Sequence, residues 1–290
     1  MNGVRNPNRL ARSAALRWQS QAVLLAFVPV TAIWVTLAAG QLCHDDAPAV
    51  WLCAAVSVGF VALVWLFHAA TAGGAITGGL IAAALFLRTP DWHTALWPLF
   101  TLVIITFAAT RFGRPRKEAL GLAEDTRGRR ASQVAANLGV AGLAVIPAAG
   151  SVAFVSGTLA DRAALTMMLA ALAEAAADTV SSELGQVLGG EPRLLTTLQP
   201  VPAGTDGAIT WVGTLAGCAG AAAVVATGQA ALLLTRTEAV ICLCAAIGGL
   251  FFDSLLGAFP ERRGWLNNDA VNALSTLFAA VVAGFACHWR

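Results

Sequence analysis

Charged residues are scarce in this chain of 290 residues, where they make up 12% of the sequence against 58% for hydrophobic residues. The mean hydropathy of +0.72 lies well outside the range of soluble domains. Lysine is rarer still, because Lys117 is the only lysine among the 18 basic residues. These shortages indicate a protein that lies in a membrane, and no nucleic-acid partner is expected.

Histidine and cysteine are too few and too scattered for transition-metal chemistry. The four histidines show no ligand spacing, and the six cysteines contain no CxxC pair. Cys242 and Cys244 are two residues apart and therefore face different ways on a helix. The sequence thus predicts neither a zinc site nor disulfide chemistry.

The motifs of soluble nucleotide-binding folds are also missing. The chain has no GxxxxGK[ST] loop, no GxGxxG loop and no HRD or DFG of protein kinases. Any phosphoryl transfer would therefore depend on positioning and charge stabilisation on another fold. No cleavable signal peptide is apparent, because Arg17-Trp18 leads directly into a full-length apolar run.

Long apolar stretches are what the chain has in abundance, and about 20 such residues cross a bilayer as a helix. We predict an all-α, polytopic integral membrane protein with about nine transmembrane helices. Residues 1–19 would form a basic cytoplasmic tail and residues 20–290 a single polytopic membrane domain. The predicted helices are 20–40, 49–69, 72–88, 94–111, 132–154, 162–188, 208–227, 238–258 and 269–288.

The basic residues predict the orientation of these helices. With the N-terminus in the cytoplasm, alternation through nine spans puts loops 112–131, 189–207 and 259–267 on the same side. That side collects 14 of the 18 lysine and arginine residues, as the positive-inside rule requires. We expect a protein of the cell inner membrane whose site faces the cytoplasm.

Four polar clusters interrupt the apolar stretches, at 178–183, 204–207, 253–254 and 267–272. A carboxylate at the centre of a membrane helix costs about 2.5–3.5 kcal/mol on insertion scales, so its default interpretation is functional. The predicted topology brings all four clusters to one depth on the cytoplasmic side. We therefore predict a functional site there.

Helical geometry at about 100° per residue refines this site. One face of the sixth predicted helix carries Glu174, Asp178, Ser181, Ser182 and Gly185. Glu183 points away from that face, so we expect it to serve a different neighbour unless the helix unwinds near Gly185. The glycines of Gly213-xxx-Gly217 and Gly220 are expected to allow close helix packing rather than to contact a ligand.

The chemistry of such a set suits a hard cation. Acidic and amide oxygens without histidine or cysteine favour Mg²⁺, or Mn²⁺, held by one or two carboxylates and by substrate phosphates. Phosphate needs cations opposite it, and residues 111–130 supply seven basic side chains. An equally weighted alternative is that these cations only set the orientation and contact anionic lipid.

Six motifs resemble, in order, those of the integral-membrane family known as domain of unknown function ninety-two. They lie at 116–130, 177–185, 200–207, 213–217, 253–257 and 268–272. The family includes transmembrane protein 19 of animals and the plant phytyl-phosphate kinase, and the resemblance covers roughly residues 70 to 288. One departure is Asp269, which stands where glutamate is expected.

The resemblance implies a prenyl-phosphate kinase that transfers the terminal phosphate of a nucleoside triphosphate, CTP being expected, to an isoprenoid monophosphate. The expected acceptors are phytyl, geranylgeranyl or farnesyl phosphate embedded in the membrane lipids. The implied catalytic residues are Asp178, Glu183, Asp206 and Asp253, of which Asp178, Asp206 and Asp253 would hold the metal. The resemblance implies Ser182, Thr205, Asn268 and Asn272 as further site residues. From the charge and position of the basic loop we add Arg116, Lys117, Arg127, Arg129 and Arg130 as residues that bind the phosphates of the substrate and the nucleotide.

Two other functions stay open at this point. Carboxylates in membrane helices, with Glu174 deep in the bilayer, also describe an ion-coupled transporter or a lipid-carrier flippase. A cytidylyl transferase of the CDP-alcohol type would share the nucleotide and the metal. The products distinguish it, because it releases pyrophosphate where a kinase releases CDP.

Overall fold

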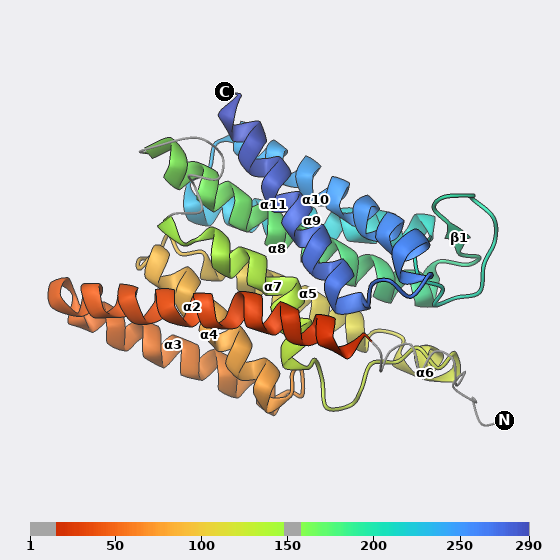
Figure 1. The fold of residues 1–290 in the computed structure, drawn as a ribbon, viewed down its shortest axis with the longest axis horizontal. Helices are drawn as coiled ribbons and strands as arrows, with labels where there is room; N and C mark the ends of the chain where they lie inside the picture. The colour runs from red at the N-terminus through yellow and green to blue at the C-terminus, as the bar shows by residue number, and fades with distance from the viewer. Residues whose placement is uncertain (1–15, 148–157, 290) are drawn as a thin grey trace.

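The computed structural model describes residues 16–147 and 158–289, which form a bundle of long α-helices with almost no β structure (Figure 1). Within these residues each predicted span falls on a helix. The long helices are α2 (Arg17–Asp45), α3 (Ala47–Leu66), α4 (Ala72–Arg88), α5 (Leu96–Arg111), α7 (Ala131–Ala144), α8 (Thr158–Leu188), α9 (Trp211–Leu232), α10 (Arg236–Leu256) and α11 (Asn268–His288). Most of the predicted basic tail, 1–15, and the end of the fifth predicted span, 148–154, lie outside the described residues.

Short elements lie between these helices. Helix α6 (Arg114–Ala119) follows α5, and a π-helical turn, η2 (Gly257–Glu261), follows α10. Strands β1 (Arg193–Leu194) and β2 (Ala208–Ile209) form one antiparallel pair between α8 and α9.

Six helices in the described ranges are long and apolar enough to cross a membrane: α2, α3, α8, α9, α10 and α11. Helices α4 and α5 are apolar but shorter, with 17 and 16 residues. The all-α membrane class is therefore confirmed. The count of nine spans and the cytoplasmic N-terminus stay predictions.

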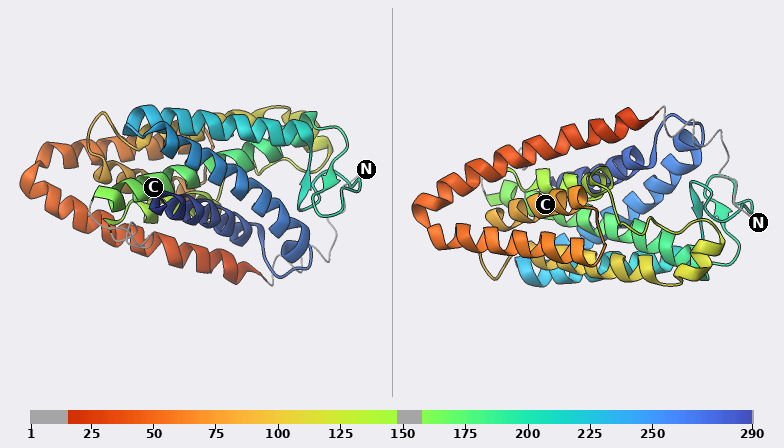
Figure 2. Two further views of the ribbon diagram at one scale, coloured as in Figure 1. Left: turned by 90° about the horizontal axis from the view of Figure 1, so that it is seen from above. Right: turned by 90° about the horizontal axis from the view of Figure 1, so that it is seen from below.

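Helix α8 lies in the centre of the bundle and α2 lies at its edge (Figure 2). In the apolar 18-residue stretch of α8, 89% of the residues are buried, whereas in that of α2 only 17% are. Alanine supplies much of α8, so neighbouring helices approach it closely. The exposed leucine, valine and isoleucine side chains of α2 suit contact with lipid, because hydrocarbon chains are as apolar as they are.

Helices α8 and α9 pack through the glycines of α9. A Cβ atom added to Gly213 or Gly217 would lie 2.6 Å from a backbone carbonyl oxygen of α8, that of Ser181 or Ala177 respectively. At Gly220 it would lie 3.2 Å from a methyl of Val180. The prediction that these glycines allow close packing is confirmed.

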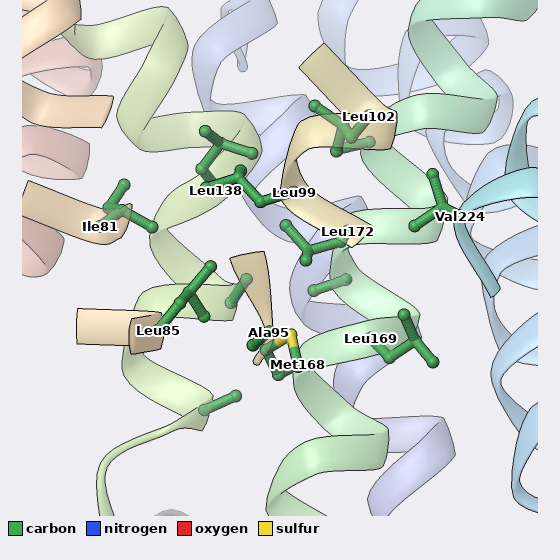
Figure 3. Packing of buried hydrophobic residues seen from close by; sticks show 14 of the residues in the cluster. Ile81, Leu85, Ala95, Leu99, Leu102, Leu138, Met168, Leu169, Leu172 and Val224 are labelled. Carbon is green, nitrogen blue, oxygen red and sulfur yellow. The ribbon is translucent and has the colours of Figure 1, made fainter. Parts of the chain in front are cut away.

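The apolar core lies where α4, α5, α7, α8 and α9 meet. Figure 3 shows Leu99 and Leu102 of α5 beside Leu138 of α7 and Leu172 of α8, with Val224 of α9 next to them. All five side chains are buried. This core fixes the relative positions of the helices that carry the polar residues.

Successive helices run in opposite directions, so their connections gather at two ends. At the α6 end, which lies to the right in Figure 1, the Nε2 of Gln19 donates to the carbonyl oxygen of Trp265 at 2.7 Å. A Cβ at Gly204 would clash with Leu122 there, so loops 112–131 and 189–207 meet at one end of the bundle, in agreement with their predicted placement on the same side. At the opposite end, Arg88 pairs with Asp161.

Candidate functional site

A polar cavity of about 270 Å³ lies at the α6 end, between α7, α8, α10, α11 and the loop before α9. All four polar clusters contribute to its lining. The predicted site residues that line it are Asp178, Ser182, Glu183, Thr205, Asp206, Asp253, Asn268, Asn272 and Arg129. The predicted binders Arg116, Lys117, Arg127 and Arg130 are not part of this lining.

Helix α8 presents the predicted polar face to the cavity. Asp178, Ser181, Ser182 and Gly185 all line it, as the helical spacing predicts. Glu174 lies one turn deeper and is 1% exposed. Helix α8 therefore carries acidic groups from the cavity wall into the bundle interior.

The deep carboxylates of α8 and α10 meet at Ser275 of α11. The hydroxyl of Ser275 donates to Oδ2 of Asp253 at 3.2 Å, and Glu174 lies beside Ser275 where both approach Gly249. Oε1 of Glu174 is buried without a hydrogen-bond partner among the described residues. A Cβ at Gly249 would lie 2.5 Å from Cγ of Glu174, so this glycine lets α10 approach the buried carboxylate.

The side chain of Glu183 points away from the helix face that carries Asp178 and pairs with a residue of another element, as predicted. Its Oε2 accepts from Nζ of Lys117 at 2.5 Å. The same Nζ donates to the carbonyl oxygens of Ala109 and Thr110 at 3.1 and 2.6 Å, at the C-terminal end of α5. Lys117 is 1% exposed, so it joins α5, α6 and α8 under the cavity wall.

Backbone hydrogen bonds fix the position of Arg129 at the cavity. Its N–H donates to the carbonyl oxygen of Ala69 at 3.0 Å, and its carbonyl oxygen accepts from N–H of Thr71 at 3.0 Å. Gly128 has φ of +80°, a left-handed conformation, and a Cβ there would lie 2.5 Å from the carbonyl oxygen of His68. Only glycine therefore suits this close approach, which fixes where the Arg129 side chain begins.

The guanidinium of Arg129 lies among polar groups of the cavity. Its Nη2 donates to Oγ1 of Thr179 at 3.3 Å, and its Nε lies 3.6 Å from Oε1 of Glu124. It also interacts electrostatically with Asp178. Its side chain is 20% exposed, so the positive charge is available at the cavity surface.

The other predicted cations of this loop lie elsewhere. The side chain of Arg127 is 82% exposed, with its Nε 3.6 Å from Oδ1 of Asp125. The backbone N–H of Arg127 donates to the same carboxylate at 3.0 Å and lowers the pKa of Asp125. Arg130 is the N-cap residue of α7, where its N–H donates to Oε1 of Gln133 at 2.8 Å, and Arg116 is exposed.

The loop before α9 closes one side of the cavity. Gly204 and Gly207 have φ of +79° and +74°. A Cβ at Gly207 would overlap the backbone of Ala258, so the loop lies directly against the start of η2. This packing places Thr205 and Asp206 in the cavity lining opposite α8.

Helix α11 supplies amides from its first turns. Asn267 caps the helix, its Oδ1 accepting from the N–H of Ala270 at 2.9 Å. Nδ2 of Asn272 donates to Oδ1 of Asn137 at 3.4 Å. Asp269 turns away, because its Oδ2 accepts from the hydroxyl of Ser20 at 2.6 Å.

Helix α7 lines the cavity with two residues that the sequence analysis missed, Gln133 and Asn137. They are four residues apart in an otherwise apolar helix, which puts them on one face. That spacing is the signal that would have found them. Glu124 and Glu261 also line the cavity from its loop edges.

The donor set of the cavity fits a hard cation. Within residues 16–147 and 158–289, no three histidine, cysteine or acidic side chains converge on one point. Asp178 and Asp253 nevertheless interact electrostatically, with asparagine amides in the same cavity. Mg²⁺ is commonly held by one or two carboxylates together with substrate phosphates, so these residues are compatible with it.

The fold and the cavity define a polytopic membrane protein with a polar site at one end of its helices. The chain belongs to the family described as Integral membrane protein DUF92, which matches residues 55–280. The match begins within α3, so α2 lies outside it. The family resemblance of the sequence motifs is thus confirmed.

Relatives of the chain occur in plants, cyanobacteria and archaea. It is 34% identical to the protein VTE6, chloroplastic, of Arabidopsis thaliana over 210 residues, which are 70% of this chain and 62% of VTE6. It is 32% identical to an uncharacterized membrane protein of Synechocystis over 198 residues, 66% of this chain and 75% of that protein. With an uncharacterized membrane protein of Methanocaldococcus jannaschii, the identity is 44% over 120 residues, 41% and 50% of the two chains. No solved structure matches the chain.

Proposed function

We propose that this protein is a prenyl-phosphate kinase. It transfers the terminal phosphate of a nucleoside triphosphate, CTP being the expected donor, to an isoprenoid monophosphate such as phytyl, geranylgeranyl or farnesyl phosphate. The bond from the terminal phosphorus to the bridging oxygen breaks, and a bond from that phosphorus to an oxygen of the acceptor phosphate forms. The products are the nucleoside diphosphate and the prenyl diphosphate.

The observation that carries the proposal is the polar cavity at one end of apolar helices, with Arg129 and several carboxylates in its lining. An isoprenoid phosphate keeps its chain in the bilayer and presents its phosphate near the membrane surface. A nucleotide reaches the same depth from the aqueous side. We place that side in the cytoplasm of a cell inner membrane, because the basic residues concentrate at the α6 end.

Charge neutralisation is the main requirement of this reaction, since two anionic phosphates must approach each other. The acceptor phosphate has no proton of high pKa to remove, so no strong general base is needed. Arg129 can bind phosphate oxygens through its planar guanidinium. Its fixed backbone keeps the charge in place before the substrate binds. A charge positioned in advance stabilises the transition state without having to reorganise, so it lowers the activation barrier effectively.

The remaining residues have complementary roles in the proposal. Asp178, Asp206 and Asp253 would hold Mg²⁺ or Mn²⁺, which when bound would neutralise phosphate charge. The hydroxyls of Ser182 and Thr205 and the amides of Asn268 and Asn272 would donate to phosphate oxygens or orient the carboxylates. Membership of the family supports the same reaction through the plant phytyl-phosphate kinase that the motifs resemble.

Product analysis tests the proposal. Purified protein in detergent is incubated with Mg²⁺, CTP labelled at the terminal phosphate and a panel of prenyl monophosphates. A kinase transfers the label to the prenyl diphosphate and releases CDP in equal amount. Release of labelled pyrophosphate would instead identify a cytidylyl transferase.

An ion-coupled transporter is the second candidate, and the buried Glu174 is the feature that favours it. The cavity lies at one end of the bundle, whereas substrate sites of such carriers lie near the midplane. Proteoliposomes separate the two. A carrier moves a prenyl phosphate or an ion across the bilayer without nucleotide, and a kinase needs nucleotide and moves neither.

A further inference from the structure

A second cavity, of about 100 Å³ and mainly apolar, lies beside the polar one. Its walls are formed by α3, with Phe60 and Val64, and by α5, with Leu102 and Val103. Helices α4 and α7 contribute the floor. On α4 the lining residues are Gly74 and Gly78, whose missing side chains leave space that larger residues would fill.

The two cavities share part of their lining. Glu124, Arg129 and Asn137 line both of them. Arg129 therefore stands where an apolar space meets a polar one. A ligand that occupied both would have an apolar part between α3 and α5 and an anionic part at the Arg129 guanidinium.

Beside the apolar cavity, a seam of side chains joins α3, with the residue Phe67 that follows it, to α5. The rings of Phe60 and Phe100 stack with centroids 6.1 Å apart, and those of Phe67 and Phe107 meet edge to face at 6.3 Å. Nη2 of Arg111 donates to the carbonyl oxygen of Phe67 at 2.6 Å. Ring contacts of this kind separate through side-chain rotation, without loss of the hydrogen bonds within either helix.

The surface around this seam is apolar. Leu63 of α3 is 57% exposed and Ile104 of α5 is 66% exposed. Exposed aliphatic side chains on membrane helices are in contact with lipid hydrocarbon. A chain dissolved in the bilayer would therefore reach the cavity through the seam without crossing water.

We propose that the apolar cavity binds the isoprenoid chain of the phosphate acceptor, with the acceptor's phosphate at Arg129. This inference rests on the proposed function, and it adds a protein site for the chain instead of leaving the chain in bulk lipid. Two ligands share the chemistry of a phosphate on a long apolar tail: a prenyl monophosphate and a phosphatidic acid. The site takes the prenyl monophosphate.

Photocrosslinking tests the site independently of turnover. The probe is farnesyl monophosphate with a diazirine at the end of its chain, added to the full protein in detergent, and the labelled residues are identified by mass spectrometry. We expect label on α3 between Phe60 and Val64 and on α5 between Leu102 and Phe107. Geranylgeranyl phosphate should compete with the probe, and geranylgeraniol and phosphatidic acid should compete at least about tenfold less well, a difference of about 1.4 kcal/mol.

Adjacent residues of α5 supply a matched pair of variants. Val103→Phe adds volume inside the cavity, whereas Ile104→Phe adds the same aromatic ring on the exposed face. We expect Val103→Phe to reduce the labelling about tenfold, because overpacking a filled site costs about 1–3 kcal/mol. Ile104→Phe should label as the wild type does. Gel filtration of both variants confirms that they are folded.

The outcomes separate this inference from the proposed function. Phosphoryl transfer with label outside α3 and α5, or with label unchanged by Val103→Phe, would contradict binding of the chain in this cavity but not the proposed kinase activity. The expected label without phosphoryl transfer would support binding of the chain in the cavity and contradict the kinase activity. Equal competition by phosphatidic acid would overturn the choice of an isoprenoid chain.

Discussion

The two ends of the bundle use charged residues differently. At the end opposite the cavity, Glu238 accepts from Nε of Arg162 and from N–H of Thr235, each at 2.7 Å, so one carboxylate both pairs a cation and caps α10. At the α6 end, Asp253 lies within electrostatic range of two other carboxylates, Asp178 and Glu174. Charges at the first end are paired and cap a helix. Carboxylates gathered in one place and buried are costly in a membrane helix, so they are the expected mark of a functional site.

The largest expected effect is on stability and concerns the buried ion pair of Lys117 and Glu183. This pair lies at the α6 end, but it holds helices together as the charged residues of the opposite end do. Lys117→Met leaves the buried Glu183 without its cation. We expect the free energy of unfolding to fall by about 3–5 kcal/mol, measured by thermal denaturation of the purified protein in detergent.

The double variant Lys117→Met with Glu183→Leu serves as the control. Replacing both charges by apolar side chains should restore much of the stability. Unchanged stability of Lys117→Met combined with weaker substrate binding would show instead that Lys117 is a ligand, as the sequence analysis predicted.

The next largest effect is on turnover. Asp253→Asn removes charge without volume, and we expect kcat to fall by about 10²–10³-fold, the loss typical of one transition-state contact. Its melting temperature should be equal or higher, because an uncharged amide is less costly to bury beside Asp178 and Glu174 than a carboxylate is. Asp269→Asn is the matched control, since Asp269 bonds to Ser20 outside the cavity lining. Equal losses in both variants would contradict the assignment.

A smaller effect is expected from the arginines of loop 112–131. Arg129→Gln should raise KM for a phosphate substrate about tenfold, a loss of about 1.4 kcal/mol, if its contact is the same in the ground and transition states. Arg127→Gln, an exposed control in the same loop, should stay within about 0.5 kcal/mol of wild type. Gly128→Ala should change KM in the same direction as Arg129→Gln, because it displaces the Arg129 backbone. Identical kinetics in all three variants would show that these arginines only set the orientation of the protein in the membrane and contact lipid.

The smallest effect on turnover is expected at the opposite end. Glu238→Gln keeps the shape of the cap but removes the charge opposite Arg162, and we expect stability alone to fall, by about 1–2 kcal/mol. The kcat of the folded fraction should equal that of wild type. A large fall in kcat without loss of stability would show that the two ends do not differ as described.

Much of the fold follows from the sequence because apolar length is a strong signal in membrane helices. The range 72–88 agrees with α4 at both ends, and 269–288 agrees with α11 to one residue. The cavity face of α8 was predictable for a similar reason. A regular helix fixes the relative directions of Asp178, Ser181 and Ser182, so no tertiary information is needed.

The loop between α5 and α7 was less predictable. Nothing in the local sequence distinguishes Arg127, Arg129 and Arg130, which lie within four residues of one loop, but their side chains lie in different surroundings. The difference depends on the left-handed φ of Gly128 and on hydrogen bonds from Arg129 to residues 69–71, far away in the chain. The burial of Lys117 likewise depends on the carbonyl oxygens at the end of α5. Local sequence contains none of these long-range contacts.

The central claim is that the carboxylates at the α6 end support phosphoryl transfer to a prenyl phosphate. The most direct measurement follows label from the terminal phosphate of CTP into geranylgeranyl phosphate with wild-type protein, Asp253→Asn and Glu238→Gln, each purified in detergent with Mg²⁺. We predict labelled geranylgeranyl diphosphate and an equal amount of CDP from wild type and from Glu238→Gln, and almost none from Asp253→Asn. Labelled product at the wild-type rate from Asp253→Asn, or none from the wild type with any prenyl phosphate, would contradict it.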